Sequence, residues 1–442
     1  MKLKIFASFD YLVFAAVLLL VTMGVVFIYS SGINSDGVLV TNEYVKQIVW
    51  ATLGLVILIF ASLYDYRKFE KISSALYFSL LIFLVITLIF GRRVNGARSW
   101  LGIGDFGIQV SEFGKIIFII FFAKFLSESA HEEVRKRFAK SLLIFAPPVL
   151  LILAQPDLGT ASVYIPIFLI MCFMANVPLR FIMFTLLFGF STIFLGVLPV
   201  WNDALAKNKI AAIVALTHFR LRLFLILSAF LVFLIALIVR RYLHGKKYFY
   251  WIGYFSLLGT LSLIASYGVG KVLKDYQIKR LIIFLDPSID PRGAGWNIIQ
   301  SKIAIGAGGI FGRGLLHGTQ SHYRFLPQQS TDFIFSILSE ELGFLGAIFV
   351  FLLYSVLFFR MLKMMRRLSS FPLFIVSGIF GMFFFHFFIN IGMVMGLMPI
   401  TGIPLLFLSY GGSSLWTAML CIGIIMSIYS HRYGEIFGIE NV

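Results

Sequence analysis

Long runs of apolar residues, separated by short polar breaks, occupy most of the chain. An apolar run of about 20 residues can cross the roughly 30 Å hydrocarbon core of a bilayer as an α-helix. We therefore predict an all-α fold, a polytopic membrane bundle of about twelve transmembrane helices. The expected spans are 10–31, 47–64, 74–91, 112–127, 141–155, 159–176, 181–199, 223–239, 249–269, 333–359, 371–397 and 411–430.

Composition agrees with this architecture and narrows the class of protein. Of the 442 residues, 60% are hydrophobic and 13% are charged, and this charged share is about half that of a soluble domain. It excludes a soluble enzyme and a disordered chain. Cys172 and Cys421 both lie inside apolar runs, so they offer neither a disulfide framework nor a thiolate metal site.

The basic residues predict the orientation in the membrane. The net charge is +17, and such an excess usually lies in cytoplasmic loops beside anionic lipid, so it implies no nucleic acid partner. The breaks after the second, fourth, eighth and tenth spans are basic, whereas the breaks at 32–46 and 398–410 carry only Lys46 between them. Both termini are therefore expected in the cytoplasm. The apolar, glycine-rich segment 270–332 is then extracytoplasmic, with re-entrant or interfacial structure.

Informative polar residues gather on the predicted outer side. Glu112 and Lys115 are three residues apart at the start of a span, so they share one helix face and can pair. Alternatively, Glu112 is a first-turn carboxylate and Ser111 is the helix cap. Asp157 follows the helix-breaking Pro156, and capping of the next helix is its more common role.

A further group of polar residues closes the long outer segment. Asp332 opens the tenth span, where a carboxylate at the mouth of a cavity beside basic residues suits a general base. An N-cap would occupy the same position, and the pattern does not separate the two roles. The glycine-rich run 306–314 lacks the Gly-Lys-Ser/Thr ending of a P-loop, so a nucleotide site is unsupported. His386 and Asn390 share one span face near small residues, which more often serve helix packing.

Six motifs carry a more specific signal. They are NGARSW, QVSE with Lys115, QPDLGT, DPRGAGWNIIQSKIAIGAGG, FLPQQSTDFIF with EELG, and NIGMVMGLMPITGIPLLFLSYGGSS. Together they resemble the SEDS family of cell-wall polymerases, and its elongation branch (RodA) more than its division branch (FtsW). The resemblance implies a peptidoglycan glycosyltransferase that polymerises lipid II into glycan strands for cell elongation and rod-shape maintenance. Lipid II is a disaccharide-pentapeptide on undecaprenyl diphosphate, and the reaction is expected on the outer face of the bacterial cytoplasmic (inner) membrane.

The resemblance also implies roles for individual residues. The family's essential aspartate falls on Asp332, expected to be the catalytic general base, and other important positions fall on Glu112, Lys115 and Asp157. The leaving diphosphate needs compensating positive charge, which a divalent cation, Mg²⁺ or Mn²⁺, could share, although no metal ligands are assigned. The candidates for binding diphosphate or glycan are Arg98, Lys279, Arg280, Gln300 and Lys302. The expected partners are a class B penicillin-binding protein that supplies transpeptidation, the elongation machinery, lipid II and membrane lipid.

The expected organisation is one membrane-embedded domain over 1–442, in which 270–332 carries the active site. The usual family fold has ten spans, so the longer chain predicts an inserted transmembrane hairpin within 200–269. Gln328 and Ser330 stand where family members commonly have glutamate and histidine. The alternatives are a lipid II flippase or a division-type role. A secondary transporter, for which no internal repeat is found, and a pure scaffold rank behind them.

Overall fold

The computed structural model describes residues 9–94, 96–103, 106–205, 210, 213–214, 217–242, 247–286, 290 and 293–436. The chain forms two compact units, which are described separately. The first contains Met1–Asn176 and Asp286–Val442, and the second contains Val177–Leu285.

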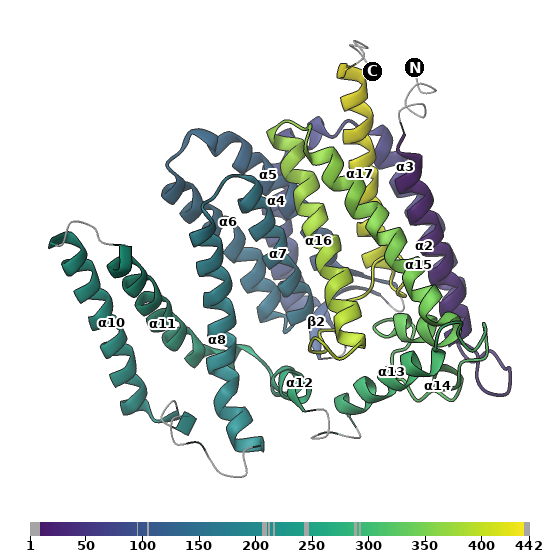
Figure 1. Ribbon diagram of the computed structural model, residues 1–442. Coiled ribbons are helices and arrows are strands. Elements are labelled where there is room, and N and C mark those ends of the chain that lie inside the picture. Colours follow the sequence, from purple (N-terminus) through teal and green to yellow (C-terminus); the bar gives the residue numbers. More distant parts are fainter. Residues whose placement is uncertain are drawn as a thin grey trace. The chain divides into compact units, whose positions relative to one another are not determined.

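The first unit is a bundle of long helices (Figure 1). The start of α2 and the end of α17 lie at the same end of this unit, as an even total number of membrane crossings requires (Figure 1). Its helices are α2 (Tyr11–Ser31), α3 (Glu43–Leu63), α4 (Arg67–Phe90), α5 (Val110–Glu128), α6 (Val134–Ala154), α7 (Leu158–Met174), α13 (Ala294–Gly308), α14 (Thr319–His322), α15 (Ile334–Met365), α16 (Ser370–Val394) and α17 (Gly412–Ile436).

Each of the twelve predicted spans falls on a helix, which confirms the membrane-bundle fold and a multi-pass membrane protein. Ten helices among the described residues are long and apolar enough to cross a membrane. The other two predicted spans form α5, which carries ionisable residues along its length, and α7, which has 17 residues. Helix α15 continues to Met365, beyond the predicted end at 359, and its last turn carries the basic residue Lys363.

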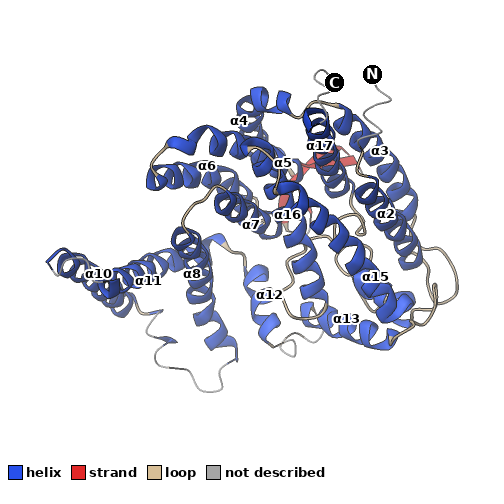
Figure 2. Cartoon of the chain, turned by 45° about the horizontal axis from the view of Figure 1, so that its top comes forward, coloured by secondary structure: helices blue, strands red, loops and turns tan. Residues whose placement is uncertain are grey.

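A small sheet between α4 and α5 was not predicted from the sequence. Strands β1 (Arg92–Val94), β2 (Ala97–Ile103) and β3 (Phe106–Gln109) form an antiparallel sheet in chain order (Figure 2). Trp100 of β2 pairs with Gln109, and α5 begins at the next residue. The sheet therefore fixes the start of the helix that carries Glu112.

Aromatic side chains fill the interior around α5. The rings of Phe118 and Phe122 are fully buried, with centroids 5.3 Å apart, and Phe122 lies 5.4 Å from Phe168 of α7. Helix α16 approaches the same helices closely, because a Cβ added at Gly378 would lie 2.8 Å from side-chain atoms of Ile119 and Met171. Such close packing leaves little freedom in the relative positions of α5, α7 and α16.

Helix α15 is interrupted at Gly343. This residue has φ 65° and ψ −159°, a conformation essentially restricted to glycine. The interruption leaves main-chain carbonyls of α15 without a hydrogen bond inside the helix, and the loop before α14 supplies N–H donors for them. The backbone N–H groups of Arg313 and Gly314 donate to the carbonyls of Glu340 and Glu341, each at 3.0 Å. Irregular backbone at membrane depth is tolerated when it is satisfied by protein in this way.

The second unit contains α8 (Leu179–Leu205), α10 (Phe219–Tyr242), α11 (Lys247–Val272) and α12 (Asp275–Leu285). Helix α11 packs against both α10 and α8. The predicted hairpin at 200–269 falls mainly on α10 and α11, although 206–209, 211–212, 215–216 and 243–246 lie outside the described residues. Only 6% of the residues in the most apolar window of α10 are buried, so most of this window is exposed or half-buried although α10 packs against α11.

Candidate active site

A buried ion pair lies in the first turns of α5. The Lys115 ammonium donates to both carboxylate oxygens of Glu112, each at 2.8 Å. Lys115 is 0% exposed and Glu112 is 4% exposed. Charges buried this deeply are stable only when they are paired and hydrogen-bonded. Because α5 begins at Val110, Ser111 lies inside its first turn rather than at the N-cap.

The ion pair continues into α16 through His386. The Lys115 Nζ lies 3.2 Å from His386 Nε2, and His386 Nδ1 lies 3.0 Å from the carbonyl oxygen of Pro404. Because a carbonyl only accepts, Nδ1 carries the ring hydrogen, and Nε2 of the neutral ring accepts from the lysine. All three N–H donors of Lys115 are therefore used inside the protein, two on Glu112 and one on His386.

One helical turn further along α16, Asn390 contacts the backbone of Asp332. The Asn390 Nδ2 donates to the carbonyl of Asp332 at 3.0 Å and to the carbonyl of Ile403 at 2.9 Å. The backbone N–H of Asp332 donates to the carbonyl of Gln328 at 3.2 Å. Asp332 is half-buried, and α15 begins two residues later with Phe333 at its N-cap. The main chain of Asp332 is therefore held on both sides.

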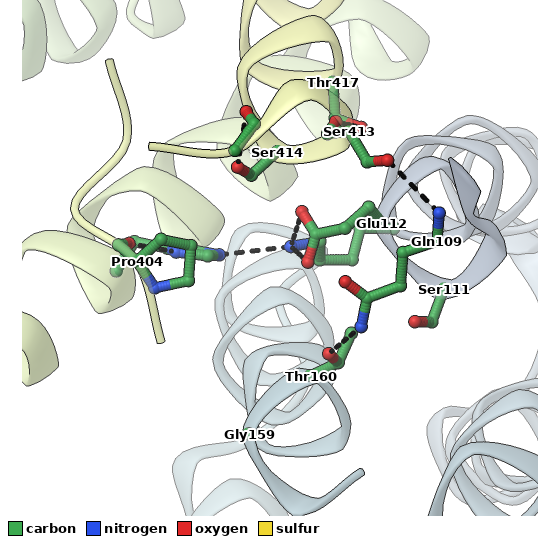
Figure 3. Close-up of polar contacts among 12 residues, drawn as sticks. Gln109, Ser111, Glu112, Gly159, Thr160, Pro404, Ser413, Ser414 and Thr417 are labelled. Carbon is green, nitrogen blue, oxygen red and sulfur yellow. Dashed lines mark hydrogen bonds and ion pairs between the residues drawn. The ribbon is translucent and has the colours of Figure 1, made fainter. Parts of the chain in front are cut away.

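Asp157 caps α7. Its Oδ1 accepts from the backbone N–H of Thr160 at 3.0 Å, and its Oδ2 accepts from the Thr160 hydroxyl at 2.9 Å. The Gln109 Nε2 also donates to Oδ2, at 2.7 Å, and the Gln109 backbone N–H donates to the Ser413 hydroxyl at 3.1 Å. Figure 3 shows Gln109 between Thr160 and Ser413, with Glu112 beside it. Gln109 thus joins the starts of α5, α7 and α17.

The candidate diphosphate ligands lie in several places. Arg98 of β2 donates through Nη1 to two carbonyls at the end of α4, each at 3.3 Å. Gln300 is buried and Lys302 is exposed, both on α13. Lys279 is exposed on α12 of the second unit, and on the same helix Arg280 lies 5.7 Å from a tyrosine ring centroid.

A second buried acidic group lies on α15. Glu340 and Glu341 are both 0% exposed. Glu340 accepts from the backbone N–H of Gln320 at 2.9 Å, whereas Glu341 accepts from the Ser30 hydroxyl and from the backbone N–H of Leu316 at 3.2 Å. These carboxylates anchor the segment 316–320 to α15, and Glu341 also ties α15 to α2 through Ser30.

Comparisons with known proteins agree with this architecture. The family model FtsW/RodA/SpoVE, described as a cell cycle protein, matches residues 10–214 and 207–434. The peptidoglycan glycosyltransferase RodA of Treponema pallidum (strain Nichols) is 51% identical over 433 residues, which is 98% of this chain and 100% of that relative. The peptidoglycan glycosyltransferase MrdB of Escherichia coli (strain K12) is 33% identical over 388 residues, 88% of this chain and 85% of that relative.

The chain belongs to the FtsW/RodA/SpoVE family. A chain in the solved structure of a peptidoglycan synthase complex, described as coordinating polymerization and crosslinking, is similar to this family member at a TM-score of 0.66. The two are 25% identical in sequence, and the match covers 96% of this chain and 98% of that chain. The resemblance to SEDS polymerases that the motifs indicated is thereby confirmed.

Two residues of this FtsW/RodA/SpoVE protein gained importance only from the structure. Gln109 is the last residue of a strand that was not predicted. The sequence places Asn390 on the same helix face as His386, and it assigns Asn390 no individual role. The partner of each lies far along the chain, 304 residues away for Gln109 and Ser413 and 58 for Asn390 and Asp332. A local sequence pattern cannot predict contacts between residues so far apart in the chain.

The described part of the chain contains no metal centre built from its own clustered side chains. Among its residues, no group of three or more His, Cys, Asp or Glu side chains is placed to hold a metal ion. The buried carboxylates described above are occupied by N–H and O–H donors of the protein. These carboxylates are therefore held by donors of the protein itself.

Proposed function

We propose that this protein polymerises lipid II with Asp332 as the general base. The chain is a peptidoglycan glycosyltransferase of the elongation type, and its relatives RodA of Treponema pallidum and MrdB of Escherichia coli are peptidoglycan glycosyltransferases by name. One observation carries the choice of Asp332. Its backbone is held by Asn390, which lies one helical turn from the contact between His386 and Lys115.

The proposed reaction joins a growing glycan to a new lipid II. Asp332 takes the proton of the acceptor sugar's 4-hydroxyl while the oxygen of that hydroxyl attacks the anomeric carbon of the donor. The bond from that carbon to the lipid diphosphate breaks, the new glycosidic bond forms, and the configuration inverts from α to β. General-base assistance of this kind typically accelerates a reaction about 10²- to 10⁴-fold.

The departing diphosphate requires positive charge where negative charge develops. Lys302 has an exposed side chain for this purpose, and Arg98, Gln300, Lys279 and Arg280 remain proposed contacts to diphosphate or glycan. Lys115 acts differently, since it is fully buried and its three donors are used by Glu112 and His386. We assign Lys115, with Glu112, to holding α5 and α16 together.

A divalent cation, Mg²⁺ or Mn²⁺, is proposed to share the positive charge that the departing diphosphate requires. The described residues contain no set of side chains placed to hold one. No step of the proposed chemistry is therefore assigned to a metal ion.

The membrane placement is proposed from the charge pattern. Basic breaks place both termini in the cytoplasm and the segment 270–332, with Asp332 at its end, outside the cytoplasmic membrane. The family-type domain then extends over 1–442, with 200–269 as an added hairpin of unassigned role. The proposed partners are a class B penicillin-binding protein and the elongation machinery, supported by the similar solved chain from a complex that coordinates polymerization and crosslinking.

A lipid II flippase is the second candidate. Its substrate and its membrane body would be the same, but it should carry ionisable residues along a path across the bilayer. Glu340, Glu341 and His386 are the deeper ionisable residues, and each has protein hydrogen-bond partners. A division-type role shares the chemistry and would differ in the partner.

The test is glycan synthesis from labelled lipid II by the purified protein with its transpeptidase partner, whose crosslinking is blocked by a β-lactam. Neither ATP nor an ion gradient is supplied. We expect polymer from the wild type and none from a folded Asp332→Ala variant. Equal polymer from both would contradict the role of Asp332. Absence of polymer from the wild type, together with lipid II movement across vesicles, would favour the flippase.

A further inference from the structure

We propose that Asn390 is a positioning residue for Asp332, which sets where the catalytic carboxylate stands relative to the acceptor sugar. The inference rests on the proposed role of Asp332 as general base. Asn390 does not touch the reacting atoms in this proposal. It acts through the main chain of the residue that does.

Asn390 joins separate segments of the chain through hydrogen bonds, which is more than a packing contact. Asn390 is 0% exposed, and both hydrogen bonds from Nδ2 end on main-chain carbonyls of other segments, Asp332 before α15 and Ile403 before α17. The amide orientation follows, because a carbonyl oxygen in place of Nδ2 would face two other carbonyl oxygens. Asn390 Oδ1 is buried without a hydrogen-bond partner among the described residues. A buried acceptor left in that state is a cost, and the two bonds from Nδ2 offset it.

The helix that carries Asn390 is itself fixed. His386, one turn earlier on α16, contacts Lys115 Nζ at 3.2 Å and the carbonyl of Pro404 at 3.0 Å. A Cβ at Gly381, on the same helix, would lie 3.1 Å from Ile170 and 3.2 Å from the carbonyl of Pro166, so α16 has little room to shift against α7. The hydrogen bond from Asn390 thus fixes the Asp332 main chain to a closely packed part of the interior.

Such positioning matters for a general base. The base must lie within hydrogen-bond reach of the proton that it removes. A displacement of about 1 Å can cost on the order of 10²-fold in rate. Loss of the Asn390 bond should therefore lower kcat while lipid II binding, and with it KM, stays nearly unchanged.

The experiment compares Asn390→Ala and Asn390→Asp with the wild type, each purified with the transpeptidase partner and assayed at several lipid II concentrations. Asn390→Asp keeps the size and shape of the side chain but loses the N–H pair. Tyr354→Phe is the matched control. The buried Tyr354 hydroxyl donates to the carbonyl of Leu406, which lies with Ile403 in the segment between α16 and α17, and this hydrogen bond does not involve Asp332. Rates are expressed per folded protein, measured by thermal unfolding of each variant.

We expect kcat to fall about 10- to 100-fold in both Asn390 variants, with KM within about threefold of wild type and Tyr354→Phe within about twofold in both constants. Unchanged kcat per folded protein, a rise in KM with kcat retained, or failure of both variants to fold would overturn the positioning role. An Asp332→Ala arm separates the two claims. If that variant is as active as wild type, the proposed function fails. If it is inactive while the Asn390 variants keep full kcat, only the positioning role fails.

Discussion

Helices α16 and α10 are similar in length but bury very different shares of their surface. In the most apolar window of α16, 61% of residues are buried at a mean hydropathy of 2.0, whereas in α10 the values are 6% and 2.9. The more apolar helix is thus the more exposed one. In a bilayer, lipid is as apolar as leucine, so hydrophobicity does not draw a helix inward. Helix α16 is interior because its glycines allow close approach and its His386 and Asn390 find partners there.

The two units also differ in the polar contacts that they bury. The first unit buries an ion pair in contact with a histidine, and one helical turn further along α16 an asparagine that bonds the main chain of Asp332. In the second unit, the Arg222 guanidinium holds α10 to α11 through the carbonyl of Leu263 at 2.7 Å and the hydroxyl of Ser266 at 2.6 Å. That contact joins two helices and adds nothing to the proposed reaction.

The largest effect is expected from breaking the ion pair beside α16. Glu112→Leu leaves the Lys115 ammonium buried with only His386, and the loss of one partner from a buried pair costs about 3–5 kcal/mol of stability. The double variant Glu112→Leu/Lys115→Met removes both charges and should recover most of that loss. The measurement is the thermal unfolding midpoint and folded yield in detergent. If the single variant is as stable as wild type, the pair is not essential to the interior of the first unit.

A smaller effect is expected from filling the close approach at α16. Gly378→Ala places a Cβ 2.8 Å from side-chain atoms of Ile119 and Met171, and overpacking of this kind costs about 1–3 kcal/mol. The matched control is Gly253→Ala in α11, where the nearest atoms, on Ala236 and Phe233, lie 3.6 and 3.8 Å away. The control should be neutral or slightly stabilising, because alanine favours a helix over glycine. Equal unfolding midpoints for the two variants would refute the contrast between the helices.

The smallest effect is expected on the lipid face of α10. Leu227 is 57% exposed, so Leu227→Ala should change stability by no more than about 0.5 kcal/mol and leave the rate of glycan synthesis within about twofold. Polymerisation and thermal unfolding of the same preparation test both expectations. A large loss of activity at unchanged stability would show that α10 contacts a partner or substrate needed for the reaction.

The helices could be predicted from the sequence because a membrane span is a local property of about 20 residues. The pairing of Glu112 with Lys115 was also accessible, since residues three apart share a helix face. The sheet that precedes α5 was missed because its strands are short and lie in a polar break. The interruption at Gly343 was missed because hydropathy does not register one backbone angle within an apolar run.

The contacts that organise the candidate site could not be predicted from the sequence. Lys115 and His386 are 271 residues apart, and Asn390 bonds the main chain of Asp332 rather than a complementary side chain. Every residue type has a main-chain carbonyl, so the identity of residue 332 could not predict that contact. The motifs predict which residues matter, and the packing of α5 against α16 brings Glu112, Lys115 and His386 together.

The most direct test of the central claim compares Asp332→Asn with Asp332→Glu in the purified complex with labelled lipid II. Asparagine keeps the shape of the side chain but cannot take the proton, whereas glutamate keeps a carboxylate within reach of the same sugar hydroxyl. We predict that Asp332→Asn retains less than about 1% of the wild-type kcat, in line with the 10²- to 10⁴-fold value of a general base, and that Asp332→Glu is clearly more active. An Asp332→Asn variant with more than about a tenth of the wild-type kcat would contradict general-base catalysis by this residue.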